Sequence, residues 1–227
     1  MSVLNENQLM GASGAGGDYE IEQSLRFDDG RDTYLSRTPS VAGNRKTWTW
    51  SGWLKIGEVG TQKSLFLGGS DTSNKTFIRF VNDALYVQES TGGSTQWRNI
   101  TTALFRDASA WYHIVINVDT TQSTDTNRVS VYINGTKITD FSTATYPTLN
   151  SDTYVNNTNT HYIGREFTSN LADLDGYLAE INFIDGQALT PDSFGETGDY
   201  GEWKPTKYAG TYGTNGFYLK FENASSL

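Results

Sequence analysis

Residues 111–119, WYHIVINVD, and residues 127–138, NRVSVYINGTKI, form the stretch that decides the fold. Both segments show the two-residue period of a β-strand with one buried face. Asn134 and Gly135 lie inside the second segment, and an Asn-Gly pair flanked by such strands is a strong signal for a tight hairpin turn. This stretch therefore predicts consecutive antiparallel strands.

The same period continues on both sides of this stretch. It is found in RKTWTWSGWLKI (45–56), KTFIRFVNDALYVQES (75–90), THYIGRE (160–166), GYLAEINFIDG (176–186) and NGFYLKF (215–221). Asn82 and Asp83 are expected to form a second hairpin turn. The only helical signal is one turn that begins after Thr190, with Pro191 at its first position. Short strands joined by polar turns predict an all-β fold, a two-sheet antiparallel jelly-roll sandwich.

Composition excludes several classes of function. The chain has 227 residues, no cysteine, two histidines and a net charge of −9, because 26 Asp and Glu outnumber 17 Lys and Arg. Disulfides and thiolate metal sites are therefore excluded, and nucleic acid is not an expected partner because phosphate binding needs a basic face. No apolar run approaches the roughly 20 residues of a membrane span, so membrane insertion is not expected. The N-terminus does not have the pattern of a secretory signal, and synthesis without a signal peptide is expected.

The N-terminal residues differ in character from the rest of the chain. Residues 1–10 carry a few spaced apolar side chains, Val3, Leu4, Leu9 and Met10, and GASGAGG (11–17) has no side chains that could build a core. Such a run is typical of a linker. We therefore predict an extended N-terminal docking arm in residues 1–23, followed by one domain in residues 24–227 that includes a C-terminal loop and a closing strand.

Several motifs resemble a known family. The strand pair at 111–135, together with SLRFDDGRDTYLSRTP (24–39), TWTWSGWLKI (47–56) and GYLAEINFIDGQALTPDSFGE (176–196), resembles laminin-G-like domains of the concanavalin A-like lectin/glucanase superfamily. The sequences of GASGAGGDYEIEQSLRF (11–27) and of the C-terminal segment are similar to those of laminin-G-like proteins of marine tailed bacteriophages. The resemblance implies a jelly-roll sandwich on the surface of a virion.

One predicted strand carries three polar residues whose spacing raises the question of whether they are catalytic. Glucanases of this superfamily have a nucleophile, a helper carboxylate and an acid/base on one strand, and the matching positions here are Glu180, Asn182 and Asp185. The helper is an amide, which cannot titrate. An offset of five residues puts Glu180 and Asp185 on opposite faces of a regular strand, whereas a retaining mechanism needs carboxyl groups about 5 to 5.5 Å apart.

The structural interpretation of this strand is simpler. Regular alternation puts Ala179, Ile181 and Phe183 in the core, with Leu178, Asn182 and Ile184 on the face of Glu180. We therefore predict that the protein is not an enzyme. His113 and His161 are likewise expected to be structural residues of the sandwich.

Carboxylates in FDDGRD (27–32) offer oxygen ligands of the kind that calcium prefers. Laminin-G-like relatives often hold calcium at a sandwich rim, so the resemblance implies that Asp28 and Asp29 are the candidate metal ligands. An Asp-Gly turn is the alternative reading of the same residues. No other cofactor is expected.

Glycan binding needs exposed aromatic faces beside polar groups. Trp97 lies in the polar segment STGGSTQWRNIT (90–101), which is expected to be a loop, and Trp203, Tyr208 and Tyr212 lie in GEWKPTKYAGTYG (201–213). These four rings are the candidate contacts for a glycan or partner. The alternative is that they fix a long C-terminal loop to the sandwich.

The leading hypothesis is a non-enzymatic virion structural protein. The expected form is a capsid surface decoration or cement protein, anchored by its arm to a major capsid or tail protein and oligomeric in the assembly. A tail-fibre or surface adhesin that binds host polysaccharide is the alternative, and a glycan hydrolase is the third possibility. Coiled-coil heptads and β-helix repeats, which would indicate a fibre shaft, are absent from the sequence.

Overall fold

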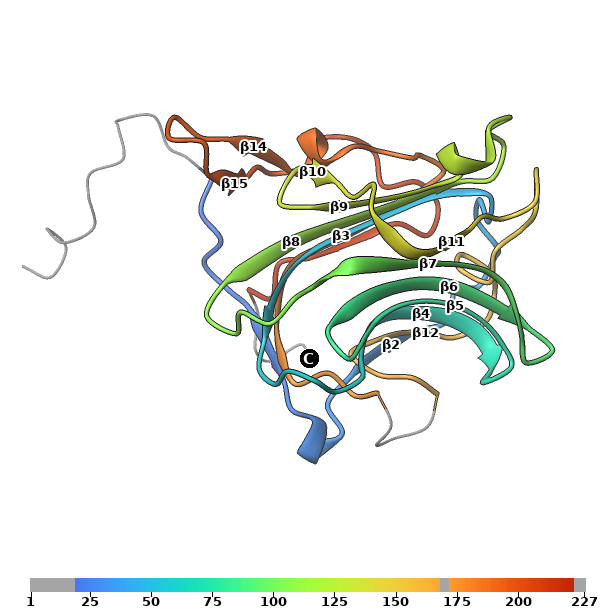
Figure 1. Ribbon diagram of the computed structural model, residues 1–227, viewed down its shortest axis with the longest axis horizontal. Helices are drawn as coiled ribbons and strands as arrows, with labels where there is room; N and C mark the ends of the chain where they lie inside the picture. The colour runs from blue at the N-terminus through green and yellow to red at the C-terminus, as the bar shows by residue number, and fades with distance from the viewer. Residues whose placement is uncertain (1–18, 168–171, 223–227) are drawn as a thin grey trace, which may run out of the picture.

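The computed structural model of the protein describes residues 19–167 and 172–222. These residues form two seven-stranded antiparallel sheets that face each other as a sandwich, which confirms the predicted fold class (Figure 1). Sheet A has the order β1-β13-β3-β8-β9-β10, and β16 also pairs with β13. Sheet B has the order β11-β7-β6-β5-β4-β12-β2, and a separate hairpin pairs β14 with β15.

The strands of sheet A are β1 (Leu25–Phe27), β3 (Thr47–Ile56), β8 (Trp111–Asp119), β9 (Val129–Ile133), β10 (Thr136–Lys137), β13 (Gly176–Asp185) and β16 (Phe217–Leu219). Those of sheet B are β2 (Leu35–Arg37), β4 (Lys63–Asp71), β5 (Asn74–Val81), β6 (Ala84–Thr91), β7 (Ser94–Leu104), β11 (Phe141–Thr145) and β12 (His161–Ile163). The outer hairpin consists of β14 (Gly195–Thr197) and β15 (Trp203–Pro205). Within the described ranges, helical structure is limited to three single turns, η2 (Asp29–Arg31), η3 (Asp125–Asn127) and η4 (Pro191–Ser193), none of them long enough to cross a membrane.

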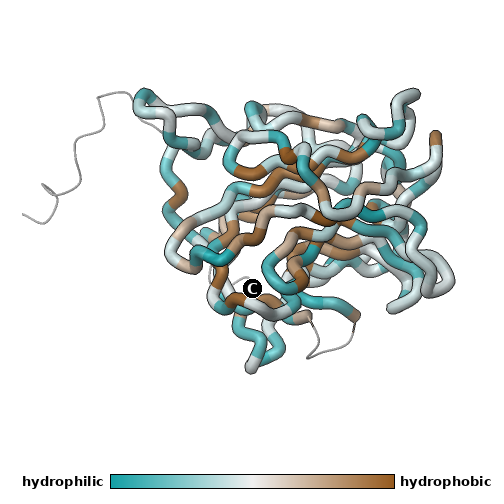
Figure 2. The backbone as a smooth tube through the Cα atoms, in the orientation of Figure 1, coloured by the Kyte–Doolittle hydropathy of each residue, from teal (hydrophilic) through white to brown (hydrophobic). Residues whose placement is uncertain are grey.

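The main core lies between the two sheets. Its largest fully buried rings are Trp48 and Trp50 of β3, Phe66 of β4 and Trp97 of β7. Hydrophobic residues are concentrated along the central strands, and hydrophilic residues occupy the peripheral turns (Figure 2). Because burying one such side chain stabilises the fold by roughly 1.5–3 kcal/mol, this layer fixes how the sheets face each other.

Both predicted hairpin turns are confirmed. Asn82 and Asp83 connect β5 to β6 with φ angles of 48° and 70°, and Asn134 and Gly135 connect β9 to β10 with φ angles of 47° and 78°. Positive φ at both central residues is the geometry whose twist matches that of the flanking strands. The turn after Thr190 is also present, as the 3₁₀ turn η4.

The prediction of a loop at residues 90–101 is wrong. Gly92 and Gly93, with φ angles of 58° and 79°, make a third tight turn, so that β6 and β7 form a hairpin. A Gly-Gly pair can adopt this geometry without strain, and the polar residues around it are strand residues on an exposed hairpin end.

β13 departs from the regular alternation expected of it. Glu180 has a φ of +50°, and the register with β3 shifts between Ala179 and Asn182, which marks a β-bulge. The bulge changes the face assignment: Leu178 joins Ile181 and Phe183 in the main core, although it had been expected on the other face.

A second, smaller core covers the face of sheet A that is turned away from sheet B, which we call the outer face. Val115 of β8 and Ile184 of β13 contribute to it from the sheet, and Phe194, which follows η4, contributes from the C-terminal segment. Residues 189–212 of the C-terminal segment therefore pack along the outer face before β16 returns to pair with β13.

The arm residues Val3, Leu4, Leu9 and Met10 lie outside the described residues. Tyr19, near the end of the predicted arm, is described: its hydroxyl donates to Glu180 at 2.7 Å and shares a hydrogen bond of 2.8 Å with the hydroxyl of Tyr218. Residues from Tyr19 onwards therefore contact sheet A.

Candidate functional site

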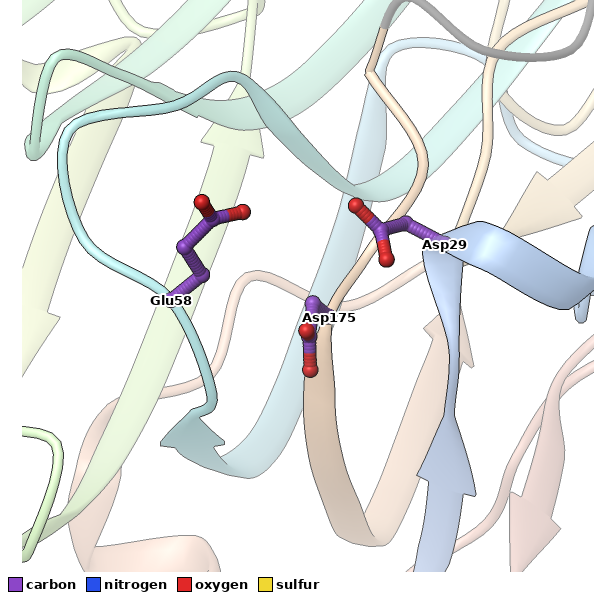
Figure 3. A group of neighbouring side chains, drawn as sticks. All are labelled: Asp29, Glu58 and Asp175. Carbon is purple, nitrogen blue, oxygen red and sulfur yellow. The ribbon is translucent and has the colours of Figure 1, made fainter.

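Three carboxylates meet at one end of sheet A. Asp29, Glu58 and Asp175 each offer an oxygen atom, and these atoms lie within 4.8 Å of one another; we call this group the carboxylate rim (Figure 3). β1, β13 and β3 are neighbours in the sheet, with Phe27 paired to Gly176 and Gly176 paired to Ile56. The segments just beyond these paired positions must therefore lie side by side, which brings the three carboxylates together.

Two cations balance part of the charge of the carboxylate rim. Arg26 Nη1 lies 2.6 Å from Asp175 Oδ1. Lys63 is fully buried; burial lowers the pKa of its ammonium, and four carboxylates, including the three of the rim, act in the opposite direction. The donor set consists of oxygen atoms alone and so fits a hard cation such as calcium, but any metal ion there would compete with the positive field of Lys63.

Of the two predicted calcium ligands, only Asp29 belongs to the rim. Asp28 Oδ1 instead accepts a hydrogen bond of 3.1 Å from the Gly30 amide, and Asp28 Oδ2 pairs with Arg31 at 3.4 Å, so this residue caps η2. The structure therefore places Asp28 at the turn and outside the carboxylate rim. Glu58 and Asp175 were missed because they lie far from Asp29 in the sequence and only sheet pairing brings them together.

An exposed aromatic row lies next to the rim on the outer face. Lys55 pairs across the sheet with Tyr177 on one side and Trp111 on the other, and these rings are 39% and 36% exposed. The Arg26 guanidinium lies 5.3 Å from the centre of the Tyr177 ring. Arg26 thus contacts both the carboxylate rim and the aromatic row.

A groove of about 300 Å³ runs beside this row. It is lined by Ile21, Glu22, Gln23, Ser24, Trp53, Trp111, Ala179 and Pro205, and we call it the aromatic groove. Indole faces beside carboxylate, amide and hydroxyl groups are the combination that binds sugars, because the ring covers the apolar face of the sugar and the polar groups pair with its hydroxyls. The sequence did not predict this groove, because Trp111 was interpreted only as the first residue of a strand.

Trp97 is not the exposed ring that the sequence predicted. It is 1% exposed and packs in the main core, because the Gly92-Gly93 turn makes residues 94–104 a strand and alternation directs this ring inward. Trp97 therefore cannot stack on a ligand at the surface.

Trp203 fixes the outer hairpin to sheet A. Its Nε1 donates to His113 Nδ1 at 2.9 Å, and the two ring planes are inclined by 18° with their centres 6.0 Å apart. The indole also lies where a Cβ at Gly135 or Gly195 would be, 2.5 Å from either position. Glycine at both positions is what lets this ring pack flat, and the ring acts as an anchor for β15.

Tyr208 and Tyr212 have the same anchoring role. The Tyr208 ring packs on Phe194 with centres 5.2 Å apart, and its hydroxyl donates to the Thr211 carbonyl at 3.0 Å. The Tyr212 hydroxyl donates to Asn182 Oδ1 at 2.9 Å, and burial raises the pKa of this phenol to about 12. These contacts fix the C-terminal loop to the sandwich.

Both histidines are buried and hydrogen-bonded within the fold. His113 Nδ1 accepts from Trp203, which leaves Nε2 as the donor to Ser51 Oγ at 2.9 Å. Burial lowers the pKa of His113 to about 3 and that of His161 to about 4. Both rings are therefore neutral near pH 7 and are used structurally.

The three polar residues of β13 do not converge. Glu180 accepts hydrogen bonds from the hydroxyls of Tyr19 and Tyr218, and Asn182 bonds Tyr212, all on the outer face. Asp185 follows Ile181 and Phe183 on the inner side, because these three residues alternate after the bulge. Its carboxylate accepts hydrogen bonds from the backbone N–H of Asn44 at 2.8 Å and from the backbone N–H of Asn215 at 3.0 Å. The bulge at Glu180 has not brought the two carboxylates to one face.

Comparison with known proteins agrees with this geometry. A family model, Laminin_G_3, described as concanavalin A-like lectin/glucanases superfamily, matches residues 29–193. A comparison with curated protein sequences finds no match. Among solved structures, domains LG4-5 of the mouse laminin alpha1 chain align over 91% of this chain and 49% of theirs, at 8% identity and a TM-score of 0.53.

A candidate carbohydrate binding protein from Bacteroides ovatus aligns over 74% of this chain and 44% of its own, at 15% identity and a TM-score of 0.50. A heptameric pentraxin from Limulus polyphemus aligns over 76% of this chain and 80% of its own, at 16% identity and a TM-score of 0.49. The chain thus spans about half of the laminin fragment and less than half of the bacterial protein, and these likenesses establish the fold alone.

Proposed function

Because this chain belongs to the concanavalin A-like lectin/glucanases superfamily, we propose that it is a non-enzymatic structural protein of a phage particle. In this proposal the sandwich faces outward as a capsid decoration or cement domain. The arm, residues 1–23, attaches it to a major capsid or tail protein, and several copies assemble on the particle surface.

The observation that carries the non-enzymatic part is the arrangement of β13. Glu180 is held by two tyrosine hydroxyls on the outer face, whereas Asp185 is held by backbone and side-chain amides on the inner face. A retaining glycosidase needs two carboxyl groups that flank one glycosidic bond, about 5 to 5.5 Å apart. Sugar release by the purified chain that is lost in Glu180→Ala would overturn this part.

Support for the particle comes from the sequence. The segment GASGAGGDYEIEQSLRF and the C-terminal motifs are similar to laminin-G-like proteins of marine tailed phages, and residues 1–10 carry apolar side chains that a docking segment would use. The decoration role is favoured over a fibre shaft because the sequence has neither heptads nor β-helix repeats.

Deletion of residues 1–17 tests the role of the arm. The deleted protein is expected to keep the thermal unfolding of the full chain, since the two core clusters seen among residues 19–167 and 172–222 remain intact, but to be lost from purified particles. A matched full-length control carries Ser2→Ala, which changes the arm without touching its apolar residues. Normal incorporation of the deleted protein would contradict an anchoring arm.

A host-glycan adhesin is the second candidate, and the aromatic groove favours it. Trp111→Ala is expected to weaken glycan binding by at least about tenfold, because a stacked ring is lost. Tyr200→Ala is the matched control, since this ring is 96% exposed and lies outside the groove. Binding measured on a set of host polysaccharides checks this candidate, and equal binding by both variants would remove the groove from consideration.

A further inference from the structure

The sandwich is open along one edge. Among the described residues, β2 closes sheet B and pairs with β12 alone, while β16 lies at the edge of sheet A and pairs with β13 alone. Both strands are short, with three residues each. A cavity of about 310 Å³ lies there, which we call the slot.

The wall of the slot is apolar. It is formed by Leu35, Phe66 and Ile163 from sheet B and by Phe183, Phe217 and Leu219 from sheet A. The volume is at the lower end of the range found for small-molecule sites, about 300 to 1,000 Å³. The slot therefore fits the apolar body of one small molecule.

The buried polar side chains of the slot already have partners. Asn156 donates its backbone N–H to His161 Nε2 at 2.8 Å and its side-chain amide to Asp185 at 2.6 Å. Asn215 donates its side-chain amide to the Val41 carbonyl and to Asn156 Oδ1, both at 2.9 Å. A sugar, which needs many free donors and acceptors, would find few here.

Arg37 is the exception at the mouth of the slot. Its Nη1 donates to the Asn215 carbonyl at 2.8 Å, and its guanidinium lies 5.8 Å from the centre of the Phe217 ring. These two contacts orient the exposed side chain and leave further N–H groups free to donate. Within residues 19–167 and 172–222, no carboxylate forms an ion pair with Arg37, although acidic residues exceed basic ones in the chain.

We propose that the slot binds a small amphipathic monocarboxylate, with its apolar body between the sheets and its carboxylate on Arg37. The guanidinium supplies paired N–H donors that match a carboxylate. His161 adds no second charge at neutral pH, because it is buried and its Nε2 accepts a hydrogen bond. This site is separate from the aromatic groove and does not rest on the function proposed above.

Titration calorimetry on the full chain with decanoate tests the proposal, and decanol serves as the uncharged probe of the same length. Decanoate is expected to bind at one site per chain, and decanol at least about tenfold more weakly, because the charge-assisted hydrogen bonds are lost. Arg37→Gln should weaken decanoate binding by a similar factor and leave decanol binding unchanged. Arg31→Gln, an exposed arginine outside the slot, is the matched control and should bind like the unaltered chain.

The comparison of the two probes on the unaltered chain does not depend on how any variant folds. Absence of saturable decanoate binding would overturn the proposal. Equal affinity for decanoate and decanol would also overturn it, because Arg37 would then play no part in recognition.

Discussion

The two faces of sheet B surround a glutamate side chain of low exposure with different partners. On the side turned away from the core, Glu166 accepts from Lys75 Nζ and from Arg79 Nη1, both at 2.6 Å, and the two cations also lie over the Phe77 ring. On the side that faces the core, Glu89 has the Thr76 hydroxyl, at 2.8 Å, as its only side-chain hydrogen-bond partner among the described residues. The first carboxylate has two counter-ions, and the second is stabilised mainly by neutral groups.

The difference shows how one sheet can pair a carboxylate with cations on one face and favour the neutral form of a carboxylate on the other. Burial raises the pKa of Glu89 to about 7, and the Thr76 hydroxyl and the Tyr154 backbone N–H only partly oppose this rise. Glu166 forms an ion triad with its two cations, and loss of its charge would leave both of them buried without a partner.

Glu166→Gln should therefore have the largest effect. It removes the counter-charge of two largely buried cations, and such a loss lowers the free energy of unfolding by about 3–5 kcal/mol. Urea unfolding at pH 7 measures it, with the exposed Glu196→Gln as the matched control. A loss below about 1 kcal/mol would mean that solvent already screens the triad.

Glu89→Gln should remove part of the pH dependence of stability. The folded-state pKa of Glu89, about 7, exceeds its ordinary value of 4.5, so its contribution is fully present below pH 4.5 and is lost as the pH rises through 7. The unaltered chain should thus lose on the order of 3 kcal/mol relative to the variant across this window. The lowered pKa values of the two histidines affect both proteins equally and cancel in the difference. A difference that stays constant with pH would contradict a titrating Glu89.

The carboxylate rim is a third environment for carboxylates, in which, among the described residues, three of them lie near only two cations, Arg26 and Lys63. If calcium binds there, a concentration of 100 times its Kd should stabilise the chain by about 2.7 kcal/mol. Glu58→Gln, whose carboxylate is exposed and forms no ion pair within the described residues, should abolish this gain, while Glu196→Gln should retain it. Thermal unfolding with calcium or with a chelator measures it. No shift in the unaltered chain would show that Lys63 and Arg26 are the only cations of the rim.

Thr76→Val should have the smallest effect. It removes the hydroxyl that Glu89 accepts from and that also accepts from the Tyr154 amide at 2.9 Å. We expect a loss of about 1 kcal/mol at pH 8, and a smaller loss at pH 5 where Glu89 is neutral. Equal losses at both pH values would indicate that only the bond to Tyr154 matters.

Local rules predicted two of the hairpin turns and missed a third. The turns at Asn82-Asp83 and Asn134-Gly135 could be predicted from these residues alone, because Asn, Asp and Gly tolerate positive φ. The Gly92-Gly93 pair carries the same signal, but the polar residues around it masked the strand that takes Trp97 into the core.

The candidate sites depend even more on tertiary structure. The bulge at Glu180 leaves no mark in the sequence, so the faces of β13 were assigned by an alternation that the fold interrupts. The carboxylate rim joins residues from three distant segments, and only Asp29 was named in advance. Trp203, Tyr208 and Tyr212 were recognised as aromatic residues of a loop, and the sequence left open both roles, anchor and ligand contact.

The copy number of this chain in purified phage particles tests the central claim most directly. Quantitative mass spectrometry against the major shell protein is the measurement. A number comparable to that of the shell protein is what a decoration or cement protein predicts. A number lower by an order of magnitude or more would place the chain in the tail, and absence from particles would contradict the virion role and leave a free sandwich domain.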